Sequence, residues 1–311
     1  MPKTSKTTVP DTVNTLLVLL GPTAVGKTEF SLSVAEHYGC PVISADSRQF
    51  YAGLSIGTAV PTLADFARVP HYFVGFLPID TTYSAGLFET DVLRILATRN
   101  TDPLAVLCGG SMLYIDAVCS GIDEIPPPAP AVRSSLYERY THKGIPPLLD
   151  ELRELDPIYY NTVDHHNYKR ILHALEICLT TGRPFSSFHT HRPKSRPFHI
   201  RKFGLTLPRE VLYERINCRV DRMMDDGLLD EARQFYPFRH FNSLNTVGYK
   251  ELFLYFDGLL SLSQAIDRIK SNTRRYARQQ LTWFRRDPTI TWLSPTDTFS
   301  CVPFRLSESN F

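Results

Sequence analysis

The feature that most constrains the fold is an apolar run that leads directly into a glycine-rich loop near the N-terminus. Residues 16–19 are all aliphatic, and residues 20–28 read LGPTAVGKT, which contains the complete Walker A pattern G-x-x-x-x-G-K-T. A helical pattern comes next. Gly21 and Gly26 permit backbone conformations that let consecutive N–H groups point inward, and a helix N-terminus adds a positive dipole. The segment therefore predicts a buried strand, a phosphate-binding loop and a helix, in that order.

The last two residues of this loop carry its chemistry. We expect Lys27 to reach the terminal phosphates of a ligand and the Thr28 hydroxyl to ligate Mg²⁺. The pattern leaves open which phosphate compound binds and whether a phosphoryl group moves.

Short apolar runs alternate with helical patterns up to about residue 121. Strand candidates at 16–20, 41–44 and 104–108 are each followed by a glycine-rich or polar turn, and a further candidate lies at 202–207. This alternation predicts an α/β protein with a P-loop core, in which helices cover both faces of a parallel sheet. Ligands of such sheets bind at the carboxyl ends of the strands, where the Walker loop, Asp46 and the Gly-Gly-Ser turn after residue 108 would gather.

Proline and charge patterns divide the chain further. The prolines within 126–130 break regular structure, the stretch from about 131 to 181 has leucines at helical spacing, and Gly-Arg-Pro at 182–184 ends it. Residues 187–197 are basic and read as a connector back to the sheet. We therefore predict three parts: an α/β core over 1–123, a helical insertion over 124–196, and a continuation of the core over 197–311, mostly helical between 208 and 286.

Composition excludes several classes of protein. The longest apolar runs are far shorter than the ~20 residues of a membrane-spanning helix, and the polar N-terminus lacks the apolar region of a secretion signal. The 6 cysteines are scattered without a C-x-x-C pair, which disfavours a disulfide framework or a metal cluster. We therefore expect a cytoplasmic protein that makes no membrane contact.

Two strand ends carry candidate functional residues. Asp46 follows the second strand and could ligate Mg²⁺ through water or accept a proton from a nucleophile. The alternative is a helix cap, because Asp and Ser are favoured there. Gly109 and Gly110 follow the third strand and either allow a ligand to approach the backbone closely or form a plain tight turn.

A helix near the C-terminus is basic and has no acidic residue between 268 and 286. At about 100° per residue, Arg274, Arg278 and Arg285 share one face, and Tyr276 and Trp283 fall on the other, which favours core positions for the two aromatics. An unmixed charge favours a polyanion such as a nucleic acid over a merely solvated face.

A second arginine pair lies upstream. Arg215 and Arg219 are four residues apart on one predicted helix face. They either clamp a diphosphate or form ordinary surface pairs.

Taken together, the motifs resemble those of the tRNA dimethylallyltransferase family, in whose order they occur from residue 16 to about residue 293. The matching segments are GPTAVGKT at 21–28, SADSRQFY at 44–51, GLSIGTA at 53–59, GGSMLY at 109–114, KRILHALE at 169–176, TVGYKE at 246–251 and RQQLTWFR at 278–285.

The resemblance implies a P-loop core with an inserted helical tRNA-binding domain. It also implies transfer of a dimethylallyl group from dimethylallyl diphosphate to N6 of adenosine 37 in the anticodon stem-loop of tRNA, with Mg²⁺ as cofactor and a monomeric protein. By matching position, Asp46 would be the general base, Thr23 and Arg219 would act on the diphosphate during catalysis, and Thr28 would ligate the metal.

Two larger sets of residues follow from the same matching positions. The diphosphate would be held by Gly21, Pro22, Thr23, Ala24, Val25, Gly26, Lys27 and Thr28. The tRNA would be contacted by Asp46, Ser47, Arg48, Gln49, Ser111, Arg133, Lys169, Arg170, His173, Asn245, Thr246, Val247, Gly248, Tyr249, Lys250, Arg278, Gln279, Gln280, Thr282, Trp283 and Arg285.

Two positions depart from the family pattern. Val25 replaces the usual Ser, a harmless change where only the backbone N–H binds. His173 stands where many members carry Arg, which would make a phosphate contact weaker or dependent on pH.

Three other functions compete with this interpretation. An enzyme that prenylates free adenine nucleotides would share the phosphate loop but would need neither the arginine stripe nor the helical insertion. A small-metabolite kinase would share the loop and transfer a phosphoryl group. A non-catalytic RNA-binding protein would not need Asp46.

Overall fold

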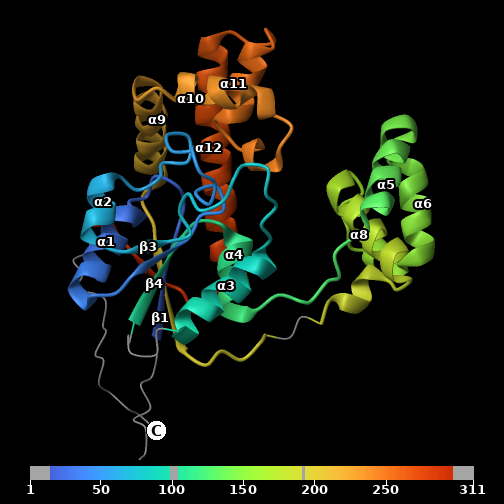
Figure 1. Ribbon diagram of the computed structural model, residues 1–311, viewed down its shortest axis with the longest axis horizontal. Coiled ribbons are helices and arrows are strands. Elements are labelled where there is room, and N and C mark those ends of the chain that lie inside the picture. The colour runs from blue at the N-terminus through green and yellow to red at the C-terminus, as the bar shows by residue number, and fades with distance from the viewer. Residues whose placement is uncertain (1–14, 99–103, 191–192, 297–311) are drawn as a thin grey trace, which may run out of the picture. The chain divides into compact units, whose positions relative to one another are not determined.

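The computed structural model describes residues 15–98, 104–190 and 193–296 (Figure 1). These residues form two compact units. The first comprises the described residues up to Ser120 and from Ser195 onwards, and the second is Gly121–Lys194. The predicted helical insertion, 124–196, covers nearly the same residues as the second unit.

The first unit is built on a six-stranded sheet in which every pair of neighbouring strands is parallel. The strand order is β3-β2-β4-β1-β5-β6. The strands are β1 (Thr15–Leu20), β2 (Val42–Ala45), β3 (His71–Tyr72), β4 (Leu104–Gly109), β5 (His199–Leu205) and β6 (Thr291–Leu293). The predicted parallel α/β fold is confirmed, including the return of the chain to the sheet after the insertion.

Helices cover both faces of this sheet. The helices described in the first unit are α1 (Lys27–Tyr38), α2 (Leu63–Arg68), α3 (Ala85–Thr98), α4 (Met112–Ser120), α9 (Arg209–Asp225), α10 (Leu228–Phe235), α11 (Tyr249–Phe256) and α12 (Leu262–Phe284), with 3-10 turns η2 (Tyr236–Phe238) and η3 (Asn242–Leu244). Of these, α10 and α11 lie beyond one end of the sheet (Figure 1). In β1, Leu16 and Val18 belong to one buried cluster, whereas Leu17 and Leu19 belong to another. This strand is therefore apolar on both sides, as its continuous aliphatic run requires.

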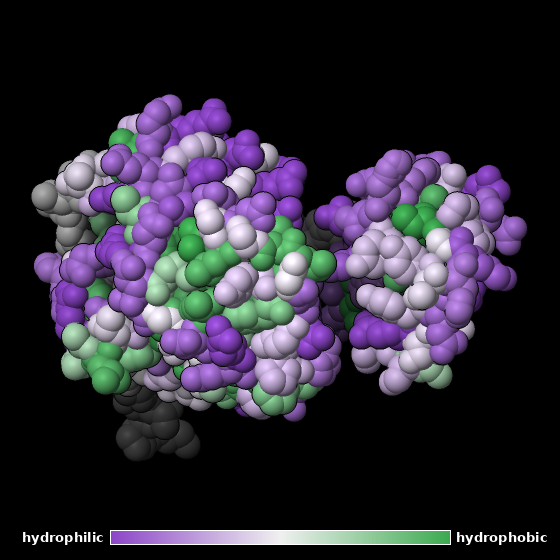
Figure 2. Space-filling view, turned by 90° about the horizontal axis from the view of Figure 1, so that it is seen from above, coloured by the Kyte–Doolittle hydropathy of each residue, from purple (hydrophilic) through white to green (hydrophobic). Residues whose placement is uncertain are grey.

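The second unit is a small helical bundle with α5 (Pro130–Lys143), α6 (Pro146–Leu155), α7 (Pro157–Tyr160), α8 (Tyr168–Thr181) and the 3-10 turn η1 (Phe185–Phe188). Its core joins Ile171 and Leu175 of α8 to Leu136 of α5 and Leu152 of α6. Hydrophilic side chains cover most of the face of this unit that is seen in Figure 2. A bundle that turns its leucines inward has this surface.

Cysteine pairing and long apolar helices can be examined in the described residues. No disulfide joins the cysteines of the described residues, and Cys301 lies outside them. In the part of the chain that the structure describes, no helix is both long and apolar enough to cross a bilayer.

Candidate active site

The Walker loop connects β1 to α1 and has the conformation that its glycines allow. Gly21 and Gly26 have positive φ angles of 147° and 108°. A Cβ atom on Gly21 would lie 2.6 Å from the carbonyl oxygen of Leu205, so a side chain has no room there. Gly26 is also the N-cap of α1, so the first N–H groups of that helix lie at the loop.

Lys27 spans this loop from its C-terminal end. Its Nζ donates hydrogen bonds to the carbonyl oxygens of Gly21 (3.0 Å) and Pro22 (2.8 Å). Burial lowers the pKa of Lys27 from 10.5 to about 8, against the opposing influence of Cys108 and Asp46. A bound anion would favour the charged form of this ammonium group, so the loop is suited to a phosphate ligand.

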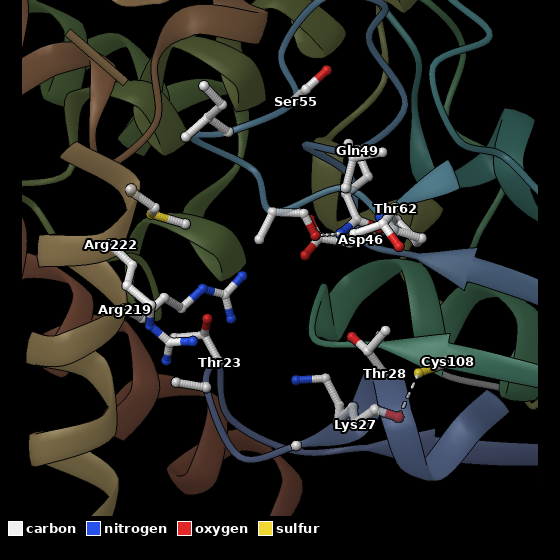
Figure 3. Close-up of a pocket in the computed structure, with 18 of the residues that line it drawn as sticks. Thr23, Lys27, Thr28, Asp46, Gln49, Ser55, Thr62, Cys108, Arg219 and Arg222 are labelled. Atoms are coloured by element: carbon white, nitrogen blue, oxygen red, sulfur yellow. Dashed lines mark hydrogen bonds between the residues drawn. The ribbon is translucent and has the colours of Figure 1, made fainter. Parts of the chain in front are cut away.

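Asp46 follows β2 and faces the same space. Its Oδ1 accepts a hydrogen bond from the N–H of Arg48 (3.0 Å), and the N–H of Ser47 donates to Ser111 Oγ (2.8 Å). Residues 47–50 form a turn, so the helix-cap alternative for Asp46 is wrong. Figure 3 shows Asp46 and Arg219 on opposite sides of the cavity, with Lys27 below them.

Three arginines of α9 lie along one side of this cavity: Arg215, Arg219 and Arg222. Arg215 donates to the carbonyl oxygen of Val25 in the Walker loop (3.3 Å). Burial lowers the pKa of the Arg219 guanidinium, and the charge of Asp46 opposes this effect. Arg219 is partly exposed and lines both cavities, whereas Arg215 is exposed and lines only the larger one. Arg222 was not predicted, although its spacing of three residues from Arg219 would have indicated the shared face.

The cavity has a volume of about 950 Å³ and two chemically different walls. The Walker loop and the arginines of α9 form the cationic wall. The apolar wall consists of Ile56, Val60, Leu63 and Phe66, from α2 and the loop before it, and Met223 adds an apolar side chain on α9 beside the arginines. Nothing in the spacing of these apolar residues marks them as a site, because they come together only when α2 and the loop before it fold over α1. Such a cavity suits a ligand with an anionic end and an apolar end.

A second cavity of about 310 Å³ adjoins the first. Both are lined by Thr23, Asp46, Arg219, Met223 and Tyr276, so these residues lie where the two cavities meet. The second cavity is otherwise lined mainly by residues around the start of α11 and the end of β2. Among the predicted tRNA contacts it contains Ser47, Arg48, Asn245, Thr246, Val247, Gly248 and Lys250.

Gln280 of α12 connects the Walker loop to the end of β4. Its side chain is 2% exposed. Its Oε1 accepts from the N–H of Thr23 (2.9 Å), and its Nε2 donates to the carbonyl oxygen of Gly110 (2.9 Å). A Cβ atom on Gly110 would lie 2.2 Å from this Nε2, and one on Gly109 would lie 2.3 Å from the Ala45 carbonyl oxygen. The two glycines are therefore required by close packing within the protein, which neither sequence alternative had included.

The basic helix α12 differs in part from its prediction. Arg278 and Arg285 are exposed, as expected. In contrast, Arg274 donates to Asn217 Oδ1 (2.6 Å), and Lys270 pairs with Asp221 (2.6 Å). These two cations are therefore satisfied within the protein.

The two aromatic residues of α12 also have different environments. Trp283 packs against the core as predicted, and its Nε1 donates to Asp116 (2.8 Å). The core position predicted for Tyr276 is wrong because this side chain lines both cavities. A helical period separates the two sides of a helix, but it does not distinguish a core from a cavity wall.

The remaining predicted residues lie at various distances from the cavities. Tyr249 is fully buried. Gln49 lines the first cavity, and its Nε2 donates to the carbonyl oxygen of Ala59 in a neighbouring loop. Gln279 and Thr282 are exposed on α12. Arg133, Lys169, Arg170 and His173 belong to the second unit.

In the second unit, Arg133 forms two hydrogen bonds with the buried carboxylate of Glu176 (2.8 and 2.9 Å). The His173 ring lies 3.6 Å from the same carboxylate. Lys169, Arg170 and His173 are exposed on α8. Arg133 and His173 therefore lie close together at the surface, and Lys169 and Arg170 are on the same helix as His173.

Known proteins resemble this chain over nearly its whole length. A family model described as IPP transferase matches residues 49–287. The tRNA dimethylallyltransferase 2 of Parabacteroides distasonis is 57% identical over 287 residues, which cover 92% of this chain and 96% of that protein. The tRNA dimethylallyltransferase 2 of Porphyromonas gingivalis is 58% identical over 283 residues, which cover 91% of this chain and 94% of that protein.

Solved structures agree. The full-length tRNA isopentenylpyrophosphate transferase of Bacillus halodurans is 35% identical, with a TM-score of 0.67 and coverage of 93% of this chain and 92% of that one. A eukaryotic dimethylallyltransferase acting on tRNA has a TM-score of 0.76 at 23% identity, covering 91% of this chain and 74% of that one, and shares the fold. On this evidence the chain belongs to the tRNA dimethylallyltransferase family of prenyltransferases.

Proposed function

We propose that this protein transfers the dimethylallyl group of dimethylallyl diphosphate to N6 of adenosine 37 in tRNA, giving N6-isopentenyladenosine and diphosphate. The observation that carries the proposal is the meeting of two cavities at Asp46 and Arg219. One cavity has an anion-binding wall and an apolar wall, which match the two ends of the donor. Family membership supplies the classes of donor and acceptor.

The donor would lie in the larger cavity. The N–H groups of the Walker loop, together with Lys27, bind its diphosphate, and the apolar wall accepts the five-carbon group. Arg219 faces the developing charge on the leaving diphosphate from within the protein, where a fixed cation is most effective. No phosphoryl transfer is required of this loop.

The acceptor amine would enter through the smaller cavity. The lone pair of N6 is delocalised into the purine ring, so the amine is a weak nucleophile. As the N6–C1 bond forms, the C1–O bond breaks with its electron pair leaving on the diphosphate, and the N6 proton passes to the Asp46 carboxylate. General base catalysis of this kind contributes about 10²–10⁴-fold. Adenosine 37 must leave its stack to reach this point, at a cost of a few kcal/mol.

A magnesium ion fits the donor cavity through the Thr28 hydroxyl, which lines it. Among the described residues, no group of three or more His, Cys, Asp or Glu side chains could hold a metal. Mg²⁺ is commonly held by one or two protein oxygens together with phosphate oxygens and water. When bound it would neutralise charge on the diphosphate, and Thr28 would orient it.

The anticodon stem-loop of tRNA would be bound by the exposed basic side chains of both units. Arg278 and Arg285 on α12, and Arg133, Lys169, Arg170 and His173 in the second unit, are suited to phosphate contacts. We further propose a monomeric enzyme in the cytoplasm, the compartment of its tRNA substrate.

Mass spectrometry of tRNA nucleosides after incubation with donor and Mg²⁺ tests the proposal. We expect N6-isopentenyladenosine at position 37 with the unaltered protein and at least 100-fold less with Asp46→Asn, which keeps the size of the side chain. Label from ATP on any acceptor would instead identify a kinase. Modification of free AMP but not tRNA would identify a nucleotide prenyltransferase.

A further inference from the structure

One irregular loop contributes to the walls of both cavities. We call residues 54–60 the cavity loop. Its Ser55, Ile56 and Val60 line the larger cavity, whereas Gly57 and Thr58 line the smaller one. The loop is neither helix nor strand. Its position therefore depends on contacts with the elements around it.

The principal contact comes from the carboxylate of Glu231 on α10, which is 8% exposed. Its Oε2 accepts from the N–H groups of Ser55 (3.0 Å) and Ile56 (2.8 Å). Its Oε1 accepts from the N–H of Gly57 (2.9 Å) and the hydroxyl of Tyr249 (2.6 Å). Three consecutive amides thus converge on one buried anion, an arrangement that fixes their orientation.

Gln49 holds the other side of the cavity loop. Its Nε2 donates to the carbonyl oxygens of Thr58 (3.2 Å) and Ala59 (2.9 Å), and its Oε1 accepts from Ser44 Oγ (2.9 Å). Gln49 is three residues from Asp46. The cavity loop is therefore aligned with the segment that carries the proposed base.

The cavity loop has no room to move away from the cavities at Gly57. A Cβ atom there would lie 2.6 Å from the ring of Tyr249, whose side chain is fully buried. Ser55 is exposed and Ile56 and Gly57 are partly exposed, so without the Glu231 carboxylate their three amide N–H groups would bond to water instead. The cavity loop would then lose its principal anchor, and the wall would lose its shape.

We propose that Glu231 is a positioning residue for the transfer reaction: by fixing the cavity loop, it sets the depth of the donor cavity and so the preference for a five-carbon allyl group over longer ones. The inference rests on the proposed function. Glu231 does not contact the reacting atoms and acts only through the loop.

The test compares Glu231→Gln with the unaltered enzyme, using tRNA with dimethylallyl diphosphate or geranyl diphosphate. The amide keeps the size of the side chain but directs an NH₂ group at backbone N–H groups, so the loop loses its anion. We expect KM for dimethylallyl diphosphate to rise at least tenfold. We also expect the ratio of kcat/KM for the two donors to fall at least fivefold, with the tRNA Kd within twofold.

Asp230→Asn is the matched control, because it removes the same charge from an exposed neighbour on α10. It should leave both donors unaffected. A purely structural role for Glu231 would lower the active fraction equally for both donors, and an unchanged ratio would overturn the inference. If the unaltered enzyme makes no isopentenyladenosine at all, it is the proposed function that fails.

Gly57→Ala examines the same cavity loop, at a residue that lines the smaller cavity, if Glu231→Gln does not fold. The added methyl group meets Tyr249 and displaces the loop toward the cavities. We expect geranyl diphosphate to be rejected at least threefold more strongly relative to the five-carbon donor. Equal losses for both donors would contradict the role of the loop.

Discussion

Lys27→Met should stabilise the ligand-free protein while abolishing donor binding. Burial lowers the pKa of this lysine from 10.5 to about 8. The folded state therefore binds the Lys27 proton more weakly than the unfolded state does. At neutral pH, where Lys27 is charged, this difference lowers the free energy of unfolding. Methionine has a similar length and carries no charge, so the substitution removes this cost. The carbonyl oxygens of Gly21 and Pro22, to which Lys27 donates, belong to buried residues, so the loss of these two hydrogen bonds offsets about 1 kcal/mol of the gain.

The size of the effect follows from the two pKa values. A shift of one pKa unit corresponds to about 1.4 kcal/mol, so the cost of charged Lys27 is about 3 kcal/mol at pH 7. The cost stays constant below the folded-state pKa and declines as the pH rises toward the unfolded-state value, reaching about 1.4 kcal/mol at pH 9.5. As the pH rises and Lys27 loses its proton, the unaltered protein becomes more stable. The difference in stability between Lys27→Met and the unaltered protein therefore becomes smaller.

Urea unfolding at pH 7 and at pH 9.5 measures both quantities. We expect Lys27→Met to be more stable by about 2 kcal/mol at pH 7 and nearly as stable as the unaltered protein at pH 9.5, where the lost hydrogen bonds offset most of the smaller gain. Lys169→Met, on an exposed face of α8, should change stability little at either pH. A variant that is less stable at pH 7, or a gain that is the same at both values, would refute the reasoning.

Three further outcomes are expected. Asp46→Asn should lower kcat at least ~100-fold with a tRNA Kd within twofold, measured by steady-state kinetics and filter binding; full turnover would remove Asp46 from the mechanism. Arg278→Ala combined with Arg285→Ala should reduce the slope of log Kobs for tRNA binding against log salt concentration by about 1–2. An unaltered slope would mean that this face of α12 contacts solvent and not tRNA. Gln280→Ala removes the acceptor of the Thr23 N–H and the shorter of two hydrogen bonds to the Gly110 carbonyl, so it should destabilise the protein by about 1–3 kcal/mol in urea unfolding, whereas a neutral result would mean that water replaces the side chain.

The sequence predicts the centre of the sheet because long apolar runs form strands that are buried on both faces. The edge strands β3 and β6 are two and three residues long and depend on pairing with β2 and β5, so no local pattern marks them. The helical pattern of 131–181 is correct in type, but it is divided into separate helices that begin at Pro146 and Pro157. Proline favours this first-turn position.

The part of the candidate site formed by residues that directly follow a strand could be predicted from the sequence. Asp46 and the Walker loop meet because parallel strands end at the same edge of the sheet. The apolar wall was not predictable, since Leu63 and Phe66 have the pattern of an ordinary short helix and become cavity residues only through tertiary packing. Helical periodicity places Tyr276 on the inner side of α12, but it cannot distinguish a side chain packed in the core from one that lines an open cavity.

The contact between α12 and the end of β4 limits which sequences can form this site. The Gln280 amide occupies the space that a side chain at position 110 would need, and it also supplies the acceptor for the amide of Thr23. Any larger residue at 110 would require a shorter one at 280, which would leave Thr23 without its hydrogen bond. Position 110 can therefore change only if position 280, 170 residues away in the chain, changes as well, so in an alignment of relatives a residue larger than glycine at 110 should occur only with a residue shorter than glutamine at 280.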